Sequence, residues 1–233
     1  MSKAESEEKP IFYSICEHGR TEPWTWGAEF AGSWRTTSDI HASWTGMMNC
    51  YEGTADLWKY QQPGAYNDPD MLEVGVGNLS DTQYLSHFVL WCMMNAPLIL
   101  GMDVSQLKDE HLAIITNPTL IALNQDSKLL QASRHRLMNG LDLLIKPLSG
   151  NRVAVCFFNK SDEKIDDFEF DLAGVSLRDA RVEVNFEHAF LVKDLLEEGM
   201  IFDSLNVTIP SLEAYELKLY LVSVYSEKVS IND

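Results

Sequence analysis

The pattern of apolar residues changes near Asp126, and this change constrains the fold more than any other feature of the sequence. Before Asp126, short continuous apolar runs alternate with segments of helical period, which is typical of parallel βαβ units with buried strands. After Asp126, apolar and polar residues alternate between turn signals, which is typical of an antiparallel β-sandwich. The sequence therefore predicts an α/β domain followed by an all-β domain.

The α/β part contains four segments that resemble buried strands. They lie at residues 11–16, 33–40, 68–75 and 98–103. In the third of these, Pro69 favours a turn that leads into the strand. A helix is predicted over residues 80–95, because Ser80 and Gln83 form a capping box and Pro97 ends the helical pattern. Further helices are predicted over residues 106–116 and 120–125, with weak helical character at 25–32.

The all-β part begins after a predicted linker at residues 127–139. Its alternating strands are predicted at residues 141–145, 152–158, 168–172, 180–184, 205–209 and 214–221. The predicted organisation is a disordered tail at 1–8, an α/β domain at 9–130, a β-sandwich at 131–226 and a second tail at 227–233. A complete (β/α)8 barrel of about 250 residues would leave no room for the sandwich in this chain.

The charge balance makes some partners unfavourable. With 18 Lys and Arg against 35 Asp and Glu, the formal net charge is -17, which opposes binding to a phosphate backbone. No apolar run approaches the roughly 20 residues that span a bilayer, and the first ten residues lack a signal peptide. We therefore expect no nucleic-acid or membrane partner and a cytoplasmic location, although a full-length relative could be secreted.

Metal and cofactor chemistry find no support in the sequence. The six histidines and four cysteines lack the spacing of metal ligands, and no Gly-rich phosphate loop follows a strand. A Gly-x-Ser-x-Gly nucleophile elbow is also missing. We therefore expect reduced thiols, no metal and no cofactor.

Polar residues near the ends of the predicted strands are candidates for chemistry. On an extended strand, Arg35, Thr37 and Asp39 share one face, so a cation and a carboxylate point the same way. The acidic turn at residues 67–70 has oxygens for a sugar hydroxyl or a cation. Taken by themselves, these residues favour a structural ion pair and a capped turn over a functional site. The aromatic residues nearby could bind a sugar face or form core; they are Trp24, Trp26, Trp34, Trp44 and Tyr66.

Taken in order, five segments resemble the motifs of the α-galactosidase (melibiase) family of clan D retaining glycoside hydrolases. These segments are residues 11–17, 33–40, 63–75, 96–101 and 121–126. The resemblance implies the C-terminal half of a (β/α)8 TIM barrel, with strands five to eight at the four predicted positions, followed by an antiparallel β-sandwich. It also places the site at the carboxyl ends of these strands.

The resemblance further implies roles for single residues. Asp39 corresponds to the general acid/base of the family's Trp-Arg-x-x-x-Asp motif. Three other residues are implied to contact the sugar: Arg35 and Glu17 near its 2-hydroxyl, and Met71 beside it. The acids Asp68 and Asp70 are implied to support these residues without contacting the sugar. Two positions depart from the family pattern, since His18 replaces a frequent Trp and residues 65–66 replace Gly-Trp.

The nucleophile of the family is the main missing element. It lies on barrel strand four in a Lys-x-Asp motif, upstream of anything in this sequence, and the pair at residues 193–194 has the wrong spacing. The implied mechanism is double displacement, with two carboxyl groups about 5 Å apart. We therefore expect hydrolysis of terminal α-D-galactosyl residues from a galactoside or oligosaccharide, and an inactive chain until an N-terminal half is supplied.

Other functions remain open at this point. A non-catalytic carbohydrate-binding or assembly module would keep the half barrel as a scaffold and be indifferent to Asp39→Asn. Within the enzyme class, α-N-acetylgalactosaminidase and β-L-arabinopyranosidase are the nearest alternatives. A half barrel also leaves strand edges unpaired, which predicts pairing with the missing half or self-association.

Overall fold

The computed structural model describes residues 11–137, 140–184, 189–197, 201–202 and 204–225. The chain divides into two compact units. The first unit contains residues up to 125 together with 129–131, and the second contains residues 126–128 and those from 132 onward. The predicted tails at 1–8 and 227–233 lie outside the described residues.

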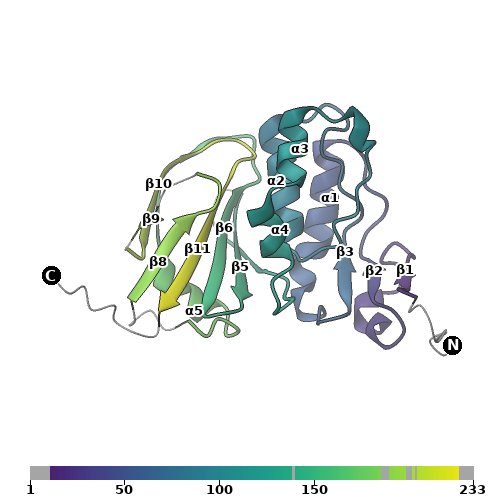
Figure 1. Cartoon of the computed structure of the whole chain (residues 1–233), viewed down its shortest axis with the longest axis horizontal. Coiled ribbons are helices and arrows are strands. Elements are labelled where there is room, and N and C mark those ends of the chain that lie inside the picture. Colours follow the sequence, from purple (N-terminus) through teal and green to yellow (C-terminus); the bar gives the residue numbers. More distant parts are fainter. Residues whose placement is uncertain (1–10, 138–139, 185–188, 198–200, 203, 226–233) are drawn as a thin grey trace. The chain divides into compact units, whose positions relative to one another are not determined.

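A parallel sheet of three short strands lies beside the helices of the first unit (Figure 1). The strands are β1 (Ser14–Ile15), β2 (Ser33–Arg35) and β3 (Tyr66–Asp68), with β2 in the middle. Trp34 is fully buried on β2 and forms a core cluster with Ile15 and its neighbours. The strands are shorter than predicted, because the chain leaves the sheet at their carboxyl ends to form polar loops.

Two predicted strands need correction. Residues 68–75 are not a turn that enters a strand, since β3 precedes Pro69 and the turn follows it. The direction reverses at Asp70, which has a φ of 88°. Residues 98–103 form only a single parallel bridge between Leu100 and Leu72, supported by the Leu72 N–H on the carbonyl of residue 99 at 2.8 Å.

The helices of the first unit lie side by side in Figure 1. They are α1 (Trp44–Thr54), α2 (Asp81–Met93), α3 (Asp109–Ile115) and α4 (Pro118–Asn124), with 3-10 turns η1 (Pro23–Thr25), η2 (Gly27–Glu29), η3 (Ala55–Lys59) and η4 (Val104–Gln106). The predicted helix at 80–95 is confirmed with its capping box between Ser80 and Gln83. The helix predicted at 106–116 begins later, at Asp109, because η4 ends at Gln106 and the next two residues are extended.

The second unit is built from two antiparallel sheets. A six-stranded sheet has the order β4-β5-β6-β11-β8-β9, and a two-stranded sheet pairs β10 with β7. The strands are β4 (Ser133–Arg136), β5 (Leu141–Leu148), β6 (Arg152–Asn159), β7 (Ile165–Asp171), β8 (Ala189–Asp194), β9 (Ile201–Phe202), β10 (Asn206–Leu212) and β11 (Leu217–Tyr225). Apolar residues of both sheets share one core, in which Phe157 of β6 meets Phe168 and Phe170 of β7.

Two predictions for the second unit are wrong. Residues 180–184 are not a strand; they follow the 3-10 turn η5 (Leu172–Gly174) and the short helix α5 (Val175–Arg178), and they consist of a turn at 180–181 and an irregular stretch at 182–184. The predicted linker contains strand β4, which pairs with β5. Local alternation of apolar and polar residues does not show whether a segment finds a partner strand. Strand β4 is an example, because its hydrogen bonds come from β5, farther along the chain.

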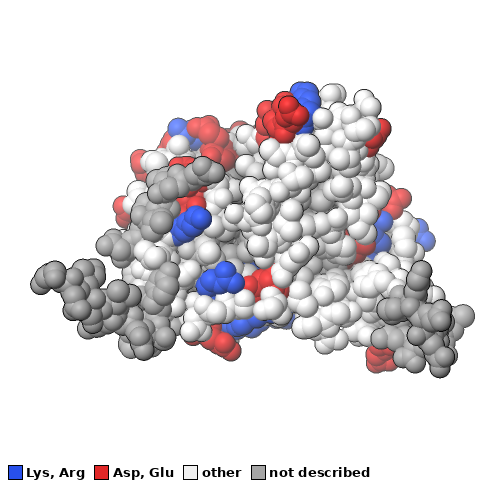
Figure 2. Space-filling model, in the orientation of Figure 1, with Lys and Arg blue, Asp and Glu red and all other residues white. Residues whose placement is uncertain are grey.

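On the face drawn in Figure 2, Lys and Arg side chains form only small patches, and Asp or Glu side chains lie beside several of these patches. No helix among the described residues is long and apolar enough to cross a bilayer.

Candidate active site

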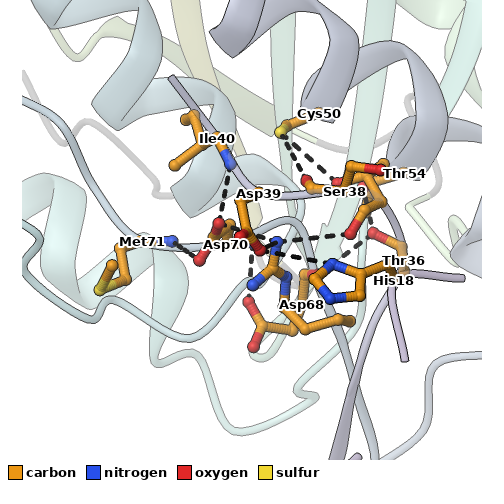
Figure 3. Close-up of polar contacts among 12 residues, drawn as sticks. His18, Thr36, Ser38, Asp39, Ile40, Cys50, Thr54, Asp68, Asp70 and Met71 are labelled. Carbon is orange, nitrogen blue, oxygen red and sulfur yellow. Dashed lines mark hydrogen bonds and ion pairs between the residues drawn. The ribbon is translucent and has the colours of Figure 1, made fainter. Parts of the chain in front are cut away.

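Three loops meet at the carboxyl end of the parallel sheet. β1 leads to Glu17 and His18, β2 to residues 36–39, and β3 to residues 69–71. The register pairs Arg35 at the end of β2 with Asp68 at the end of β3. The carboxyl ends of parallel strands are the usual position of binding sites in α/β proteins. Figure 3 shows the polar contacts among these loops.

Arg35 is the centre of the cluster. Its Nη2 lies 2.8 Å from Asp70 Oδ2 and 3.2 Å from Asp39 Oδ1, and donates to the Thr37 carbonyl at 3.3 Å. The Arg35 residue is only 8% exposed, so its charge is largely removed from water. A buried guanidinium needs anionic partners to offset desolvation, and two carboxylates provide them. The arrangement fixes the guanidinium in one place.

Asp39 differs from the buried members of the cluster. Its side chain is 67% exposed, and His18 Nδ1 lies 3.3 Å from the same oxygen that contacts Arg35. The strand β2 has already ended at Arg35, so the predicted strand alternation does not bring Arg35 and Asp39 together; the loop does. Asp39 is therefore anchored on one side and open to an external molecule on the other.

Asp70 connects the loops through hydrogen bonds to their backbone. Its Oδ2 accepts the N–H of Ile40 at 2.8 Å, and its Oδ1 accepts the N–H of Met71 at 2.9 Å. The Asp70 carbonyl accepts a hydrogen bond from the Trp91 indole of α2 at 2.8 Å. These bonds retain a residue whose left-handed backbone is unfavourable outside glycine. Asp70 thus connects the Arg35 side chain, the Asp39 loop and the helix layer.

The pKa values of two further acids near the cluster are raised. Burial raises the pKa of the Asp68 carboxyl, although the Asp70 N–H and the Arg35 charge oppose this effect. Asp68 Oδ1 accepts the Asp70 N–H at 2.9 Å, so its role in the structure is to shape the turn. Burial also raises the pKa of Glu73, and the negative charge of Asp70 adds to that shift.

Glu17 and Met71 lie on the flanking loops. Both carboxylate oxygens of Glu17 accept the Thr21 N–H, at 3.0 and 3.2 Å, so the carboxylate caps its own loop. Among the described contacts, none joins Glu17 to the Arg35 cluster. Met71 is 39% exposed and is fixed through its backbone N–H. The structure therefore gathers Arg35, Asp39, Asp68 and Asp70, and leaves Glu17 and Met71 at the rim.

Two residues near the site were not singled out from the sequence as contributors. His18 contacts Asp39, 21 positions along the chain, and Trp91 of α2 donates to the Asp70 carbonyl. Neither contact is indicated by the periodicity of the sequence. Of the aromatic residues considered, Trp34 is core, and its indole donates to Asn67 Oδ1 at 2.8 Å. Trp26 is 39% exposed. Within the described residues, no group of three His, Cys, Asp or Glu side chains is arranged to hold a metal.

The chain thus joins an α/β domain, with an acidic cluster at the carboxyl end of its parallel sheet, to an antiparallel β domain. The sequence profile of the family described as α-galactosidase A matches residues 6–126. An α-galactosidase from Oryza sativa subsp. japonica is 44% identical over 153 residues, covering 65% of this chain. α-Galactosidase A from Cellvibrio japonicus (strain Ueda107) is 35% identical over 227 residues, covering 91% of this chain. The chain belongs to the α-galactosidase A family, a family of glycosidases.

Solved structures agree on the fold. α-Galactosidase I from Mortierella vinacea has a TM-score of 0.80 at 25% identity, covering 94% of this chain. Such neighbours combine a TIM barrel with a β domain, and the sheets and helices here correspond to part of that fold. The chain spans 36% of the rice protein, 56% of the Cellvibrio protein and 60% of the Mortierella structure.

Proposed function

We propose that this chain contributes the acid/base half of a retaining α-galactosidase that hydrolyses terminal α-D-galactosyl residues. The observation that carries the proposal is the exposed Asp39 carboxylate, held by a buried Arg35 at the carboxyl end of a parallel sheet. Asp39 contacts Arg35 and still remains two-thirds exposed. This exposure leaves room for a leaving-group oxygen.

In the proposed reaction, Asp39 first acts as a general acid. It donates its proton to the glycosidic oxygen while a carboxylate nucleophile attacks the anomeric carbon, which breaks the glycosidic bond and forms a glycosyl-enzyme. Asp39, now ionised, then takes a proton from water as the water attacks the same carbon and releases the nucleophile. Arg35 keeps the Asp39 carboxylate in place through both steps.

The rim residues are proposed to bind the sugar. Glu17 and Arg35 would meet its 2-hydroxyl, and the exposed Met71 would contact the ring. Asp70 and Asp68 would support the site without touching the sugar: Asp70 binds Arg35 and the Ile40 N–H, and Asp68 shapes the turn through the Asp70 N–H. In this proposal the Glu17 carboxylate favours a free hydroxyl at that position over an N-acetyl group.

We also propose that the sheet corresponds to barrel strands five to eight, and that further βα units carrying the nucleophile complete it. The chain spans 36% to 56% of the two relatives described above, which agrees with a partial barrel. Among described strands, β1 pairs on one side only. Two apolar side chains outside the three strands are exposed. Phe12, just before β1, is 65% exposed, and Ile99, next to the Leu72–Leu100 bridge, is 53% exposed. Such surface is typical of an interface.

Complementation tests these proposals. The chain is assayed with an aryl α-galactoside alone and after co-expression with the N-terminal βα units of a related α-galactosidase, with co-elution as the check on assembly. We expect no turnover alone and turnover by the complex. Turnover by the isolated chain would refute the need for a second half, and an assembled but inactive complex would refute the enzymatic function.

Asp39→Asn in the active complex tests the acid/base assignment. We expect a loss of about 10²- to 10⁴-fold in kcat, because a general acid/base contributes that much. An unchanged kcat would favour a non-catalytic module instead. Aryl glycosides of galactose, N-acetylgalactosamine and L-arabinopyranose then separate the three sugar specificities, and we expect the α-galactoside to give the highest kcat/KM.

A further inference from the structure

We propose that His18 is a positioning residue, which orients the Asp39 carboxylate so that only its Oδ2 oxygen is free to carry the transferred proton. This inference rests on the proposed acid/base role of Asp39. The starting observation is that His18 Nδ1 and Arg35 Nη2 both contact Asp39 Oδ1, at 3.3 and 3.2 Å (Figure 3).

The two contacts leave the Asp39 oxygens unequal. Within the described part of the chain, both neighbours bind Oδ1, and Oδ2 has no polar contact. The Asp39 side chain is 67% exposed, so packing restrains it little and the polar contacts determine its orientation. A carboxylic acid whose Oδ1 accepts two hydrogen bonds keeps its own proton on Oδ2. That oxygen is then the one available to an external acceptor.

The loop that carries His18 is built for this contact. His18 has a φ of 62°, a left-handed conformation that non-glycine residues seldom adopt. The next residue, Gly19, lies against the loop that follows β2, since an added Cβ would be 2.2 Å from the Thr36 carbonyl oxygen. The Glu17 carboxylate closes the same loop by accepting the Thr21 N–H. Close packing and a capped turn therefore retain an unfavourable backbone that aims the imidazole at Asp39.

The contact requires a proton on Nδ1, which gives an assay that needs no catalysis. Nitrogen NMR of the labelled chain reports the tautomer of His18 in the neutral imidazole at alkaline pH. We expect the Nδ1–H form in the wild-type chain and loss of that preference in Asp39→Ala. An Nε2–H form in the wild-type chain, or the same tautomer in both proteins, would overturn the proposal.

Two matched substitutions test the effect on catalysis in the completed enzyme. His18→Asn and His18→Asp have nearly the same shape, and both residues tolerate the left-handed backbone. The Asn amide places a donor where Nδ1 lies, whereas the Asp carboxylate repels Asp39. We expect His18→Asn to keep most of the wild-type kcat and His18→Asp to lose about 100-fold, with a smaller change in KM.

The outcomes separate this inference from the proposed function. Equal kcat values for the two variants would overturn the positioning role, whether both were high or both were low. If the assembled wild-type protein fails to hydrolyse the galactoside, the proposed function fails. The tautomer measurement then still decides whether His18 donates to Asp39.

Discussion

Arginine and aspartate meet in both units of the molecule, but the carboxylates differ in what remains free. In the second unit, Asp179 is 3% exposed, and Arg181 and Ser133 bind its oxygens, with the shortest Arg181 distance at 2.6 Å. In the first unit, Asp39 is 67% exposed and is bound through one oxygen. Both oxygens of Asp179 accept hydrogen bonds from the protein, which is typical of a structural ion pair. Asp39 is contacted by Arg35 through Oδ1, so its second oxygen is left open to an external molecule.

The two units also differ in how their sheets are completed. The second unit has six antiparallel strands in one sheet and two in another, and both contribute to a shared core. The first unit has three parallel strands of two or three residues each, with exposed apolar residues near the ends of the sheet. We infer that the second unit supplies most of its own stability, whereas the first presents surface for additional strands.

The largest expected effect is on the core of the second unit. Phe157 is fully buried and its ring is 5.1 Å from Phe170 and 6.2 Å from Tyr220. We expect Phe157→Ala to lower the free energy of unfolding by about 4 kcal/mol, because it leaves a cavity among aromatic rings. Hydrogen-exchange mass spectrometry of β5 and β6 measures this change.

Tryptophan fluorescence provides the comparison for that substitution. All six tryptophans lie between residues 24 and 91, so their signal reports the first unit alone. We expect the fluorescence transition of Phe157→Ala to shift much less than hydrogen exchange in the strands. A fluorescence shift of the same size would break the distinction between the two units.

The next effect tests the helix layer of the first unit. His87 of α2 is fully buried, and its Nε2 accepts the Glu73 N–H at 2.9 Å. Burial lowers the pKa of His87 to about 3, from 6.5 in the unfolded chain. Only the unfolded state binds the proton between these values, so the stabilising contribution is complete above pH 6.5 and is lost as the pH falls towards 3.

We expect this loss to reach about 3 kcal/mol between pH 7 and pH 4. His87→Gln removes the titration and keeps an acceptor near the Nε2 position. Denaturant unfolding followed by tryptophan fluorescence should therefore show a weaker pH dependence in the variant. Parallel curves for the two proteins would show that His87 is not buried in its neutral form.

A smaller effect sharpens the comparison of the two aspartates. Burial would raise the pKa of Asp179, but the hydrogen bonds from Arg181 and Ser133 together lower it. We expect Asp179→Asn to cost about 2 kcal/mol of stability, because hydrogen bonds to a charged group are lost inside the protein. Asp39→Asn should change stability by less than about 0.5 kcal/mol, as surface substitutions do. Thermal unfolding measures both variants, and equal losses would contradict the distinction.

The smallest effect on stability concerns the exposed apolar surface. Ile99→Lys should change the free energy of unfolding by less than about 0.5 kcal/mol, since the side chain is already exposed. Sedimentation equilibrium should nevertheless show less self-association if this surface pairs with other chains. Leu177→Lys is the matched control, because Leu177 is 90% exposed in the second unit. The same loss of association in both variants would argue against a specific edge.

Local sequence patterns predicted the elements whose determinants are local. The capping box of Ser80 and Gln83 fixes the start of α2 within four residues, so that helix was predictable. Helix α1 was not predicted, since its residues include two glycines, which are unfavourable inside a helix. The alternation at residues 180–184 correctly indicates that Val182 and Val184 face the core, yet no partner strand pairs with them.

The candidate site was predictable only in part, because its contacts join separate loops. The resemblance to the family identified Arg35, Asp39 and Asp70, which the structure brings together. The spacing of Arg35 and Asp39 suggested a shared strand face, but β2 ends at Arg35 and a loop makes the contact. The His18 contact depends on the close approach of Gly19 to Thr36 in the loop after β2, which no pattern in the sequence indicates.

The way Asp70 is bound has a consequence for assembly. Its hydrogen bonds to Ile40, Met71 and Trp91 order the Asp39 loop within the first unit itself. A partner that completes the sheet would then meet a surface already in its final conformation. Its binding would not bear the entropy of ordering these loops, so affinity would depend on shape complementarity and rigid-body association rather than on induced folding.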